Sequence, residues 1–168
     1  MKMHCNPVFL RSCLLSAAAL AAPLSASSTE YGSIVVHAKE AKLVDAYAYH
    51  HPASYDAKET QTTVLLVDRP IDVNAIKAAG GKLDAAAHAW LDKQKAAYWE
   101  AIFYADGTYW SGKVVAPGVL TYEGAACQVA MTRNDAVRAE GSCRSDDAAA
   151  KDNKEDGVYV DVKFSTAF

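Results

Sequence analysis

The amino-acid sequence predicts a mostly β protein: an antiparallel two-sheet β-sandwich of about eight strands with a two-helix insertion. Three observations support this fold class. The hydrophobic pattern has a period of two over most of the chain, turn signals recur at short spacing, and a helical period occurs only between residues 72 and 91. The sequence contains no internal repeat and no Pro- or Ser-rich linker, so we expect one domain.

The first 27 residues have the composition of a secretory signal peptide. Lys2 and Arg11 supply positive charge, and residues 13–22 form an apolar run that is too short to span a bilayer. We therefore predict a signal peptide over 1–27, a β-sandwich domain over 28–168 and no transmembrane segment. The mature protein is then periplasmic or secreted, and its source is bacterial.

Removal of this segment makes the chain more acidic. The 168 residues include 17 basic and 20 acidic residues, a net charge of -3, and the loss of Lys2 and Arg11 leaves -5. Small residues suited to cleavage occur at Ala26, at Ser27 and at 19–21. An acidic surface repels polyanions, so we predict no nucleic-acid partner.

Two cysteines, Cys127 and Cys143, remain in a chain expected in an oxidising compartment. We predict a disulfide between them, worth about 3 kcal/mol of stability. Their spacing is not Cys-x-x-Cys, which argues against redox chemistry. A bridge directly across their hairpin requires both side chains on one face, and we expect a loop of three or five residues to provide this.

The first strands are expected as a hairpin of residues 32–36 and 42–49 across residues 37–41. Residues 62–67 are apolar on both faces, which is typical of a central strand covered from both sides. Pro70 ends this strand.

Two helices are expected next. Asp72 is a good N-cap, Ile71 and Ile76 occupy the hydrophobic-staple positions, and Gly80-Gly81 ends the first helix. The second helix has one apolar stripe, formed by Leu83, Ala86, Ala87, Trp90 and Leu91. We expect this stripe to pack on the sheet with Trp90 as its anchor.

Asp106-Gly107 predicts a type I′ hairpin with a two-residue turn. The register then pairs Tyr104 with Tyr109, Phe103 with Trp110, Ala101 with Gly112, Glu100 with Lys113 and Trp99 with Val114. One face is core: Trp99, Ala101, Phe103, Trp110, Gly112 and Val114. The other is half polar: Tyr98, Glu100, Ile102, Tyr104, Tyr109, Ser111 and Lys113.

The remaining chain predicts a hairpin of residues 127–133 and 137–143, a charged loop over 145–156 and a closing strand over 157–165. In that strand we expect Val158, Val160, Val162 and Phe164 inward and Tyr159, Asp161 and Lys163 outward. A membrane barrel is the alternative, because a strand ending in Phe168 is similar to outer-membrane barrels. The lack of alternation at 64–67 and the two helices favour the sandwich.

Several segments carry a resemblance to known proteins: GSIVV at 32–36, KEAKL at 39–43, AYAY at 46–49, VLLVDRP at 64–70, Asp106-Gly107 and YVDVKF at 159–164. With these strand and turn patterns the chain resembles a group of small, uncharacterised exported bacterial β-sandwich proteins. The resemblance implies the fold and export. It implies no activity or catalytic residue.

The first candidate site is the half-polar face of the central hairpin, with Tyr98, Tyr104 and Tyr109 beside Glu100 and Lys113. Tyrosines on an accessible sheet form a rigid contact surface for a protein or a sugar. The alternative is that the helical insertion covers them.

His50 and His51, with Asp45 and Asp56 near in sequence, are the candidates for a metal site. Adjacent strand residues point to opposite faces, so both imidazoles share an ion only if the chain turns at Pro52. Such a cluster is also the basis of the alternative that the protein is a hydrolase with an unrecognised His and acid site. A polar strand end is the simpler interpretation.

Two further acidic groups have structural interpretations. Asp84, His88 and Asp92 recur at i, i+4 and i+8, which an ordinary solvated helix face also produces. The acidic run after residue 145 departs from the EF-hand pattern, since lysines occupy the third and twelfth positions from Asp152. We expect no metal and no cofactor.

The sequence thus favours an exported, non-enzymatic binding or inhibitor-type protein of the bacterial envelope, whose partner is an envelope or extracellular protein. No nucleophile motif or phosphate-binding glycine loop occurs in it. Two alternatives stay open: the hydrolase with a site around His50, His51 and Asp45, and a structural envelope subunit that associates through an edge strand.

Overall fold

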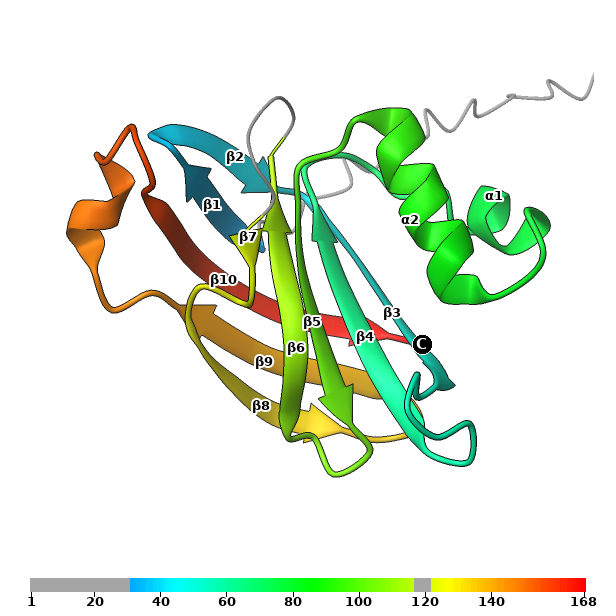
Figure 1. Ribbon diagram of the computed structural model, residues 1–168. Coiled ribbons are helices and arrows are strands. Elements are labelled where there is room, and N and C mark those ends of the chain that lie inside the picture. The colour runs from blue at the N-terminus through cyan, green and yellow to red at the C-terminus, as the bar shows by residue number, and fades with distance from the viewer. Residues whose placement is uncertain (1–30, 117–121) are drawn as a thin grey trace, which may run out of the picture.

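The computed structural model describes residues 31–116 and 122–168, so the predicted signal peptide over 1–27 lies outside the described residues. The described chain forms two antiparallel five-stranded sheets, with two helices beside one of them (Figure 1). This confirms the predicted two-sheet β-sandwich with a helical insertion. Ten strands are present within these residues, rather than about eight.

Sheet A has the strand order β2-β1-β10-β9-β8. These strands are β1 (Gly32–Val36), β2 (Lys39–Leu43), β8 (Gln128–Asn134), β9 (Arg138–Arg144) and β10 (Val158–Ala167). Sheet B has the order β3-β4-β5-β6-β7. It contains β3 (Asp45–Pro52), β4 (Thr60–Val67), β5 (Tyr98–Tyr104), β6 (Tyr109–Val115) and β7 (Tyr122–Glu123).

The main core lies between the two sheets and is built from alternate residues of each strand. Trp99 and Phe103 enter it from β5, and both are fully buried. The Phe164 ring of β10 lies 5.8 Å from the Trp99 ring between centroids. The expected inward residues of the closing strand, Val160, Val162 and Phe164, are buried here, so that part of the prediction is confirmed.

A second core lies on the outer face of sheet B, beneath the helices α1 (Val73–Ala78) and α2 (Leu83–Gln94). Asp72 caps α1 as expected, because its carboxylate accepts from the Ala75 N–H at 2.9 Å. Ala87 and Leu91 of α2 are buried, whereas Trp90 is only partly buried at the edge of this core. The expectation that Trp90 anchors the helix is therefore wrong: the buried residues of α2 are Ala86, Ala87 and Leu91. The central strand β4 is covered on both sides, as predicted.

The first hairpin differs from the prediction. Its turn is His37-Ala38, with φ of 50° and 58°, and the partner strand β2 ends at Leu43. The chain then passes at Val44 into the other sheet, where the Val44 N–H donates to the Val67 carbonyl at 2.8 Å. The predicted strand 42–49 is therefore two strands of two sheets, which lets buried residues on both sides of Val44 enter the same core.

The outer face of β10 also departs from expectation. Tyr159 is on the predicted outward side but is 1% exposed. A short 3₁₀ helix, η1 (Ala148–Lys151), lies within the predicted loop, and the Lys151 ammonium is 4.2 Å from the centre of the Tyr159 ring. Lys151 and Arg144, which is hydrogen-bonded to Tyr159, both lie against this side chain and contribute to its burial.

The predicted disulfide is confirmed: Cys127 and Cys143 are bonded, with Cα atoms 5.6 Å apart. The predicted odd-length loop is wrong. Asn134 pairs with Ala139, which gives an even-length tip, and the register then shifts between Met131 and Arg133. The bulge adds one residue to β8, so that Val129 pairs with Cys143. Cys127, two residues before Val129, therefore lies on the same face as Cys143.

Candidate functional site

The structure divides the predicted tyrosine face on the outer side of sheet B. Tyr98 is buried in the core under α2, and Glu100 beside it is 3% exposed. Tyr104 is half-buried, near the end of β5. Tyr109 points the other way, toward sheet A, where its ring lies 6.2 Å from that of Phe103. The three tyrosines therefore do not form one surface.

The hairpin between β5 and β6 turns through three residues, and the predicted two-residue turn is wrong. The Tyr104 N–H donates to the Thr108 carbonyl, and the Tyr104 carbonyl accepts from the Gly107 N–H, both at 2.9 Å. Gly107 has a φ of 85°, which glycine adopts without strain. The Asp106 carboxylate accepts from the Thr108 N–H at 2.8 Å and so stabilises the longer turn.

A β-bulge at Trp110 absorbs the extra turn residue. Phe103 pairs with Tyr109 instead of Trp110, and Ile102 pairs with Ser111, so Trp110 is left without a pairing position on β5. The predicted pairs nearer the base of the hairpin are confirmed. The bulge moves Trp110 from the predicted core face to the outer face, where it is 44% exposed.

Three aromatic rings meet there. We call Tyr55, Tyr104 and Trp110 the aromatic cluster. The Trp110 ring lies 5.1 Å from the Tyr104 ring and 5.4 Å from the Tyr55 ring, and the two tyrosine rings are 6.1 Å apart. Tyr55 comes from the loop between β3 and β4 and is 52% exposed. The cluster joins three segments that are separate in the sequence.

Two polar side chains, Gln61 of β4 and His51 of β3, lie beside the aromatic cluster on the outer face of sheet B. We call them the polar row. Gln61 of β4 pairs in register with Tyr104 on one side and with His51 on the other, so these three side chains share the outer face. His51 is engaged, since its Nε2 lies 2.8 Å from the Thr63 hydroxyl. Gln61 is 2% exposed, and its Nε2 has no hydrogen-bond partner within the described part of the chain.

Glu100 and Lys113 belong to a different group, a partly buried ionic cluster between α2 and sheet B in which Glu100 is the buried member. His88 Nε2 lies 2.6 Å from a Glu100 carboxylate oxygen, and Lys113 Nζ lies 3.8 Å from the other. Asp84 accepts a hydrogen bond from the Tyr49 hydroxyl at 3.1 Å and lies 3.7 Å from His88 Nδ1. The expectation of a solvated face is therefore wrong for His88, because the helix turns it toward sheet B.

These neighbours set the protonation of the cluster. The hydrogen bond that His88 donates to the Glu100 carboxylate raises the pKa of His88, and this outweighs the opposing effect of burial. Burial, followed by the charges of Asp84 and Glu100, raises the pKa of Tyr49. The His88 imidazole thus lies between two carboxylates that favour its protonated form, and its contact with Glu100 joins α2 to sheet B.

The histidines of β3 do not lie together. The strand continues through Pro52, so His50 points to the inner face and His51 to the outer face. The His50 ring packs 4.0 Å from the Phe168 ring, and Asp45, at the other end of β3, accepts from the Ile71 N–H. This separation gives no support to a hydrolase site around His50, His51 and Asp45.

Within 31–116 and 122–168, no group of three or more His, Cys, Asp or Glu side chains is placed to hold a metal ion. The acidic residues after position 145 are engaged locally. Asp147 caps η1 by accepting from the Ala149 N–H at 2.9 Å, and Asp146 accepts from the Gln128 amide at 3.1 Å.

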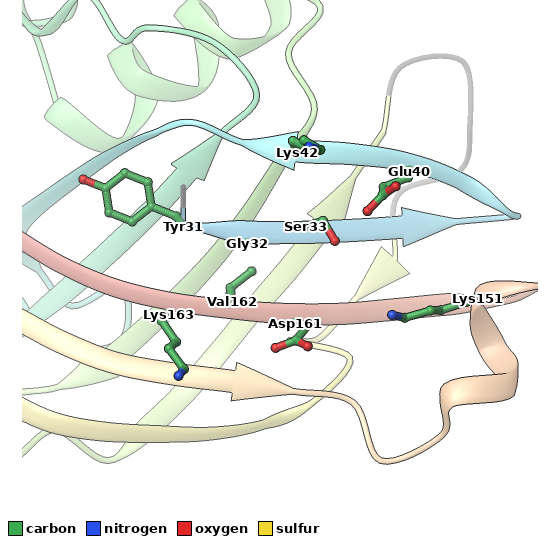
Figure 2. Close-up of a pocket in the computed structure, with 9 residues that line it drawn as sticks. All are labelled: Tyr31, Gly32, Ser33, Glu40, Lys42, Lys151, Asp161, Val162 and Lys163. Atoms are coloured by element: carbon green, nitrogen blue, oxygen red, sulfur yellow. The ribbon is translucent and has the colours of Figure 1, made fainter. Parts of the chain in front are cut away.

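A shallow hollow of about 370 Å³ lies on the outer face of sheet A (Figure 2). Its charged lining residues have both signs: Glu40, Lys42, Lys151, Asp161 and Lys163. Asp161 lies 3.6 Å from Arg144, and Lys151 is engaged with the Tyr159 ring. Mixed charges that neutralise one another are typical of a solvated sheet surface, and we assign no ligand to this hollow.

Comparison with known protein families finds no family model that matches the chain, and searches of curated proteins and of solved structures find no match either. Across the described segments, no helix is long and apolar enough to cross a membrane. The Cys127–Cys143 disulfide is compatible with a periplasmic or extracellular protein.

Sequence reasoning placed Tyr104 at this surface but missed Tyr55, Gln61 and Trp110. Tyr55 lies in a polar loop without hydrophobic periodicity, and Gln61 directly precedes the apolar run over 62–67 from which the strand was predicted. Trp110 was assigned to the core by a register that the bulge changes. The only available signal was the aromatic content of the hairpin itself.

Proposed function

We propose that this chain is an exported, non-enzymatic binding or inhibitor-type protein of the bacterial envelope, and that it contacts its partner through the aromatic cluster. The observation that carries the proposal is the exposure of Trp110. Trp110 is 44% exposed, although a bulge in a regular hairpin fixes its position and two further rings lie near its own ring.

Burial of these exposed rings against a partner would remove apolar surface from water, which favours binding. Trp and Tyr are the residues that most often dominate binding energy, because they bury a large area at a low cost in side-chain entropy. A bulge that aims a side chain outward at a sheet edge is a recurrent feature of functional surfaces. Tyr55 and Trp110 are two of the five large hydrophobic residues that are exposed in the described chain.

Export is supported by independent features. Residues 1–27 have the composition of a signal peptide, and the disulfide forms readily outside the cytoplasm. The acidic net charge disfavours polyanions as partners. Envelope proteins and glycans are partner classes that an exposed aromatic surface can contact.

The test is affinity capture from the envelope fraction of a bacterial host, with protein and carbohydrate components both quantified. We compare the wild type with a Tyr104→Ala, Trp110→Ala double variant and with Tyr122→Ala. Tyr122 is the matched control, because it is also 44% exposed but lies outside the aromatic cluster. The double variant should lose components that the control retains. Equal recovery of every component by all three proteins would contradict the proposal.

A further inference from the structure

We propose that the aromatic cluster binds a neutral oligosaccharide. The sugar packs against the Trp110 and Tyr104 rings, and its hydroxyl groups lie against the polar row, Gln61 and His51, where one of them accepts a hydrogen bond from Gln61. This inference rests on the proposed function and names the ligand class of the same surface. It follows from four properties of the site: ring geometry, an unpaired amide, local charge and size.

The ring geometry suits a sugar. A pyranose has an apolar face of C–H groups surrounded by hydroxyls, and C–H groups are attracted to the negative face of an aromatic ring. The Trp110 ring is inclined at 68° to Tyr104 and at 48° to Tyr55. Trp110 is 44% exposed and Tyr55 is 52% exposed, so a ligand can reach both residues from solvent.

Gln61 supplies a polar group with an unmet requirement. Its Nε2 is buried without a hydrogen-bond partner among the described residues, at the position directly opposite Tyr104 in register. A buried donor without a partner destabilises the folded state, because it has lost its hydrogen bonds to water. A ligand hydroxyl oxygen that accepts from this amide would remove that destabilisation, after a small shift of the side chains that cover it.

The charge around the aromatic cluster selects a neutral ligand. Partial removal from water raises the pKa of the Tyr55 phenol, with further contributions from Tyr104, Glu59 and Asp56. The carboxylates of Glu59 and Asp56 make the electrostatic potential around the Tyr55 ring negative. Asp56 and Glu59 outnumber Lys58, the single basic residue of the same loop, so an anionic glycan would be repelled.

The size of the surface favours a small ligand over a protein. Three rings within 6.1 Å of one another cover far less than the roughly 800 Å² that each partner contributes to a standard protein interface. The adjoining row is polar, and a short oligosaccharide uses both the apolar rings and the polar row.

The experiment is calorimetric titration of the disulfide-bonded protein, purified from the periplasm, with cellotetraose, chitotetraose, maltotetraose and mannotetraose. A heparin tetrasaccharide is the anionic control. We expect millimolar or tighter affinity for at least one neutral sugar. Trp110→Ala should weaken it about tenfold or more, and Tyr122→Ala should leave it unchanged.

Gln61→Leu separates a binding role from a structural one. This change removes the unpaired donor, so the urea midpoint should stay equal or rise while sugar affinity falls about threefold or more. Failure of every neutral sugar to bind, or binding of the heparin fragment alone, overturns the oligosaccharide assignment. In that case, loss of a protein component in the envelope capture leaves the proposed function intact, whereas an unchanged capture contradicts both.

Discussion

His88 of α2 and Glu100 of β5 form an ion pair with 2.6 Å between Nε2 and Oε2, and the carboxylate is almost fully buried. The pair joins the helical insertion to sheet B across the second core. Lys113 balances the other carboxylate oxygen at 3.8 Å. Removing one partner of such a pair costs more than the pair itself contributes, because the remaining charge is left in a poorly solvated site.

We therefore expect His88→Ala to lower the free energy of unfolding by about 3 kcal/mol. Urea denaturation followed by circular dichroism measures this. Lys93→Ala, an exposed change on the same helix, is the control and should stay within about 0.5 kcal/mol of the wild type. Similar values for the two variants would mean that the ion pair does not attach the helix.

Stability should also fall as the pH rises. The pKa of His88 is raised above its ordinary value of 6.5, chiefly by the hydrogen bond to Glu100, so the folded state binds this proton more tightly. The resulting stability is complete below the pKa of the unfolded chain and is lost as the pH passes through the raised value. Urea titrations from about pH 6 to about pH 9 should show this decline in the wild type and a flatter profile in His88→Ala.

His50 provides the control for the pH profile. Burial lowers its pKa, so its contribution to stability is present above the pKa of the unfolded chain and is lost as the pH falls through the lowered pKa of the folded state. A His50→Gln variant should retain the decline at high pH and lose part of the decline at low pH. An identical high-pH slope in His88→Ala and the wild type would refute the assignment to His88.

The disulfide should contribute about 3 kcal/mol, since its cysteines are 16 residues apart. A Cys127→Ser, Cys143→Ser double variant should lose that amount in urea denaturation. Reduction of the wild type with dithiothreitol should lower the midpoint to the same value, because both treatments release the same loop. A double variant as stable as the oxidised wild type would show that the bridge does not stabilise the fold.

Gly112 is a position where the two central strands leave no room for a side chain. A Cβ atom there would lie 2.3 Å from the Glu100 backbone oxygen, which cannot move without breaking the β5–β6 ladder. Gly112→Ala should therefore cost about 2 kcal/mol or more.

Gly81→Ala provides the comparison for Gly112→Ala. Its Cβ would meet no atom within 4 Å, and only the positive φ of 77° opposes the change, at about 1 kcal/mol. The reverse order of the two thermal midpoints would argue against this register.

The sequence was sufficient for features that depend on local pattern. The apolar run of β4, the Asp72 cap and the disulfide pairing were all predicted, since each follows from periodicity, capping chemistry or the cysteine count. The Glu100–Lys113 pairing was also predicted, although its burial was not. That burial depends on where α2 lies, and a helix with several polar residues on one side gives no indication that His88 turns inward.

The candidate site was harder to predict because it depends on register. Turn length and bulges are decided by individual hydrogen bonds, such as the one from the Thr108 N–H to the Asp106 side chain. A single extra residue exchanges the faces of Tyr109 and Trp110. Periodicity alone therefore identified the hairpin and its aromatic character but assigned these two rings to the wrong sides.

The three-residue turn and the bulge at Trp110 have a further consequence for the β5–β6 hairpin. The turn has one residue more than a two-residue turn, and the bulge adds one residue to β6. The pairs from Ile102–Ser111 to Tyr98–Val115 therefore keep the register that a two-residue turn without a bulge would give. The strand pairing at the base of the hairpin therefore does not depend on the irregular pairing at its tip. Substitutions at the exposed positions of the tip, such as Trp110, should therefore leave the pairing of the base unchanged, whereas Tyr109 packs against the main core and is not free to vary.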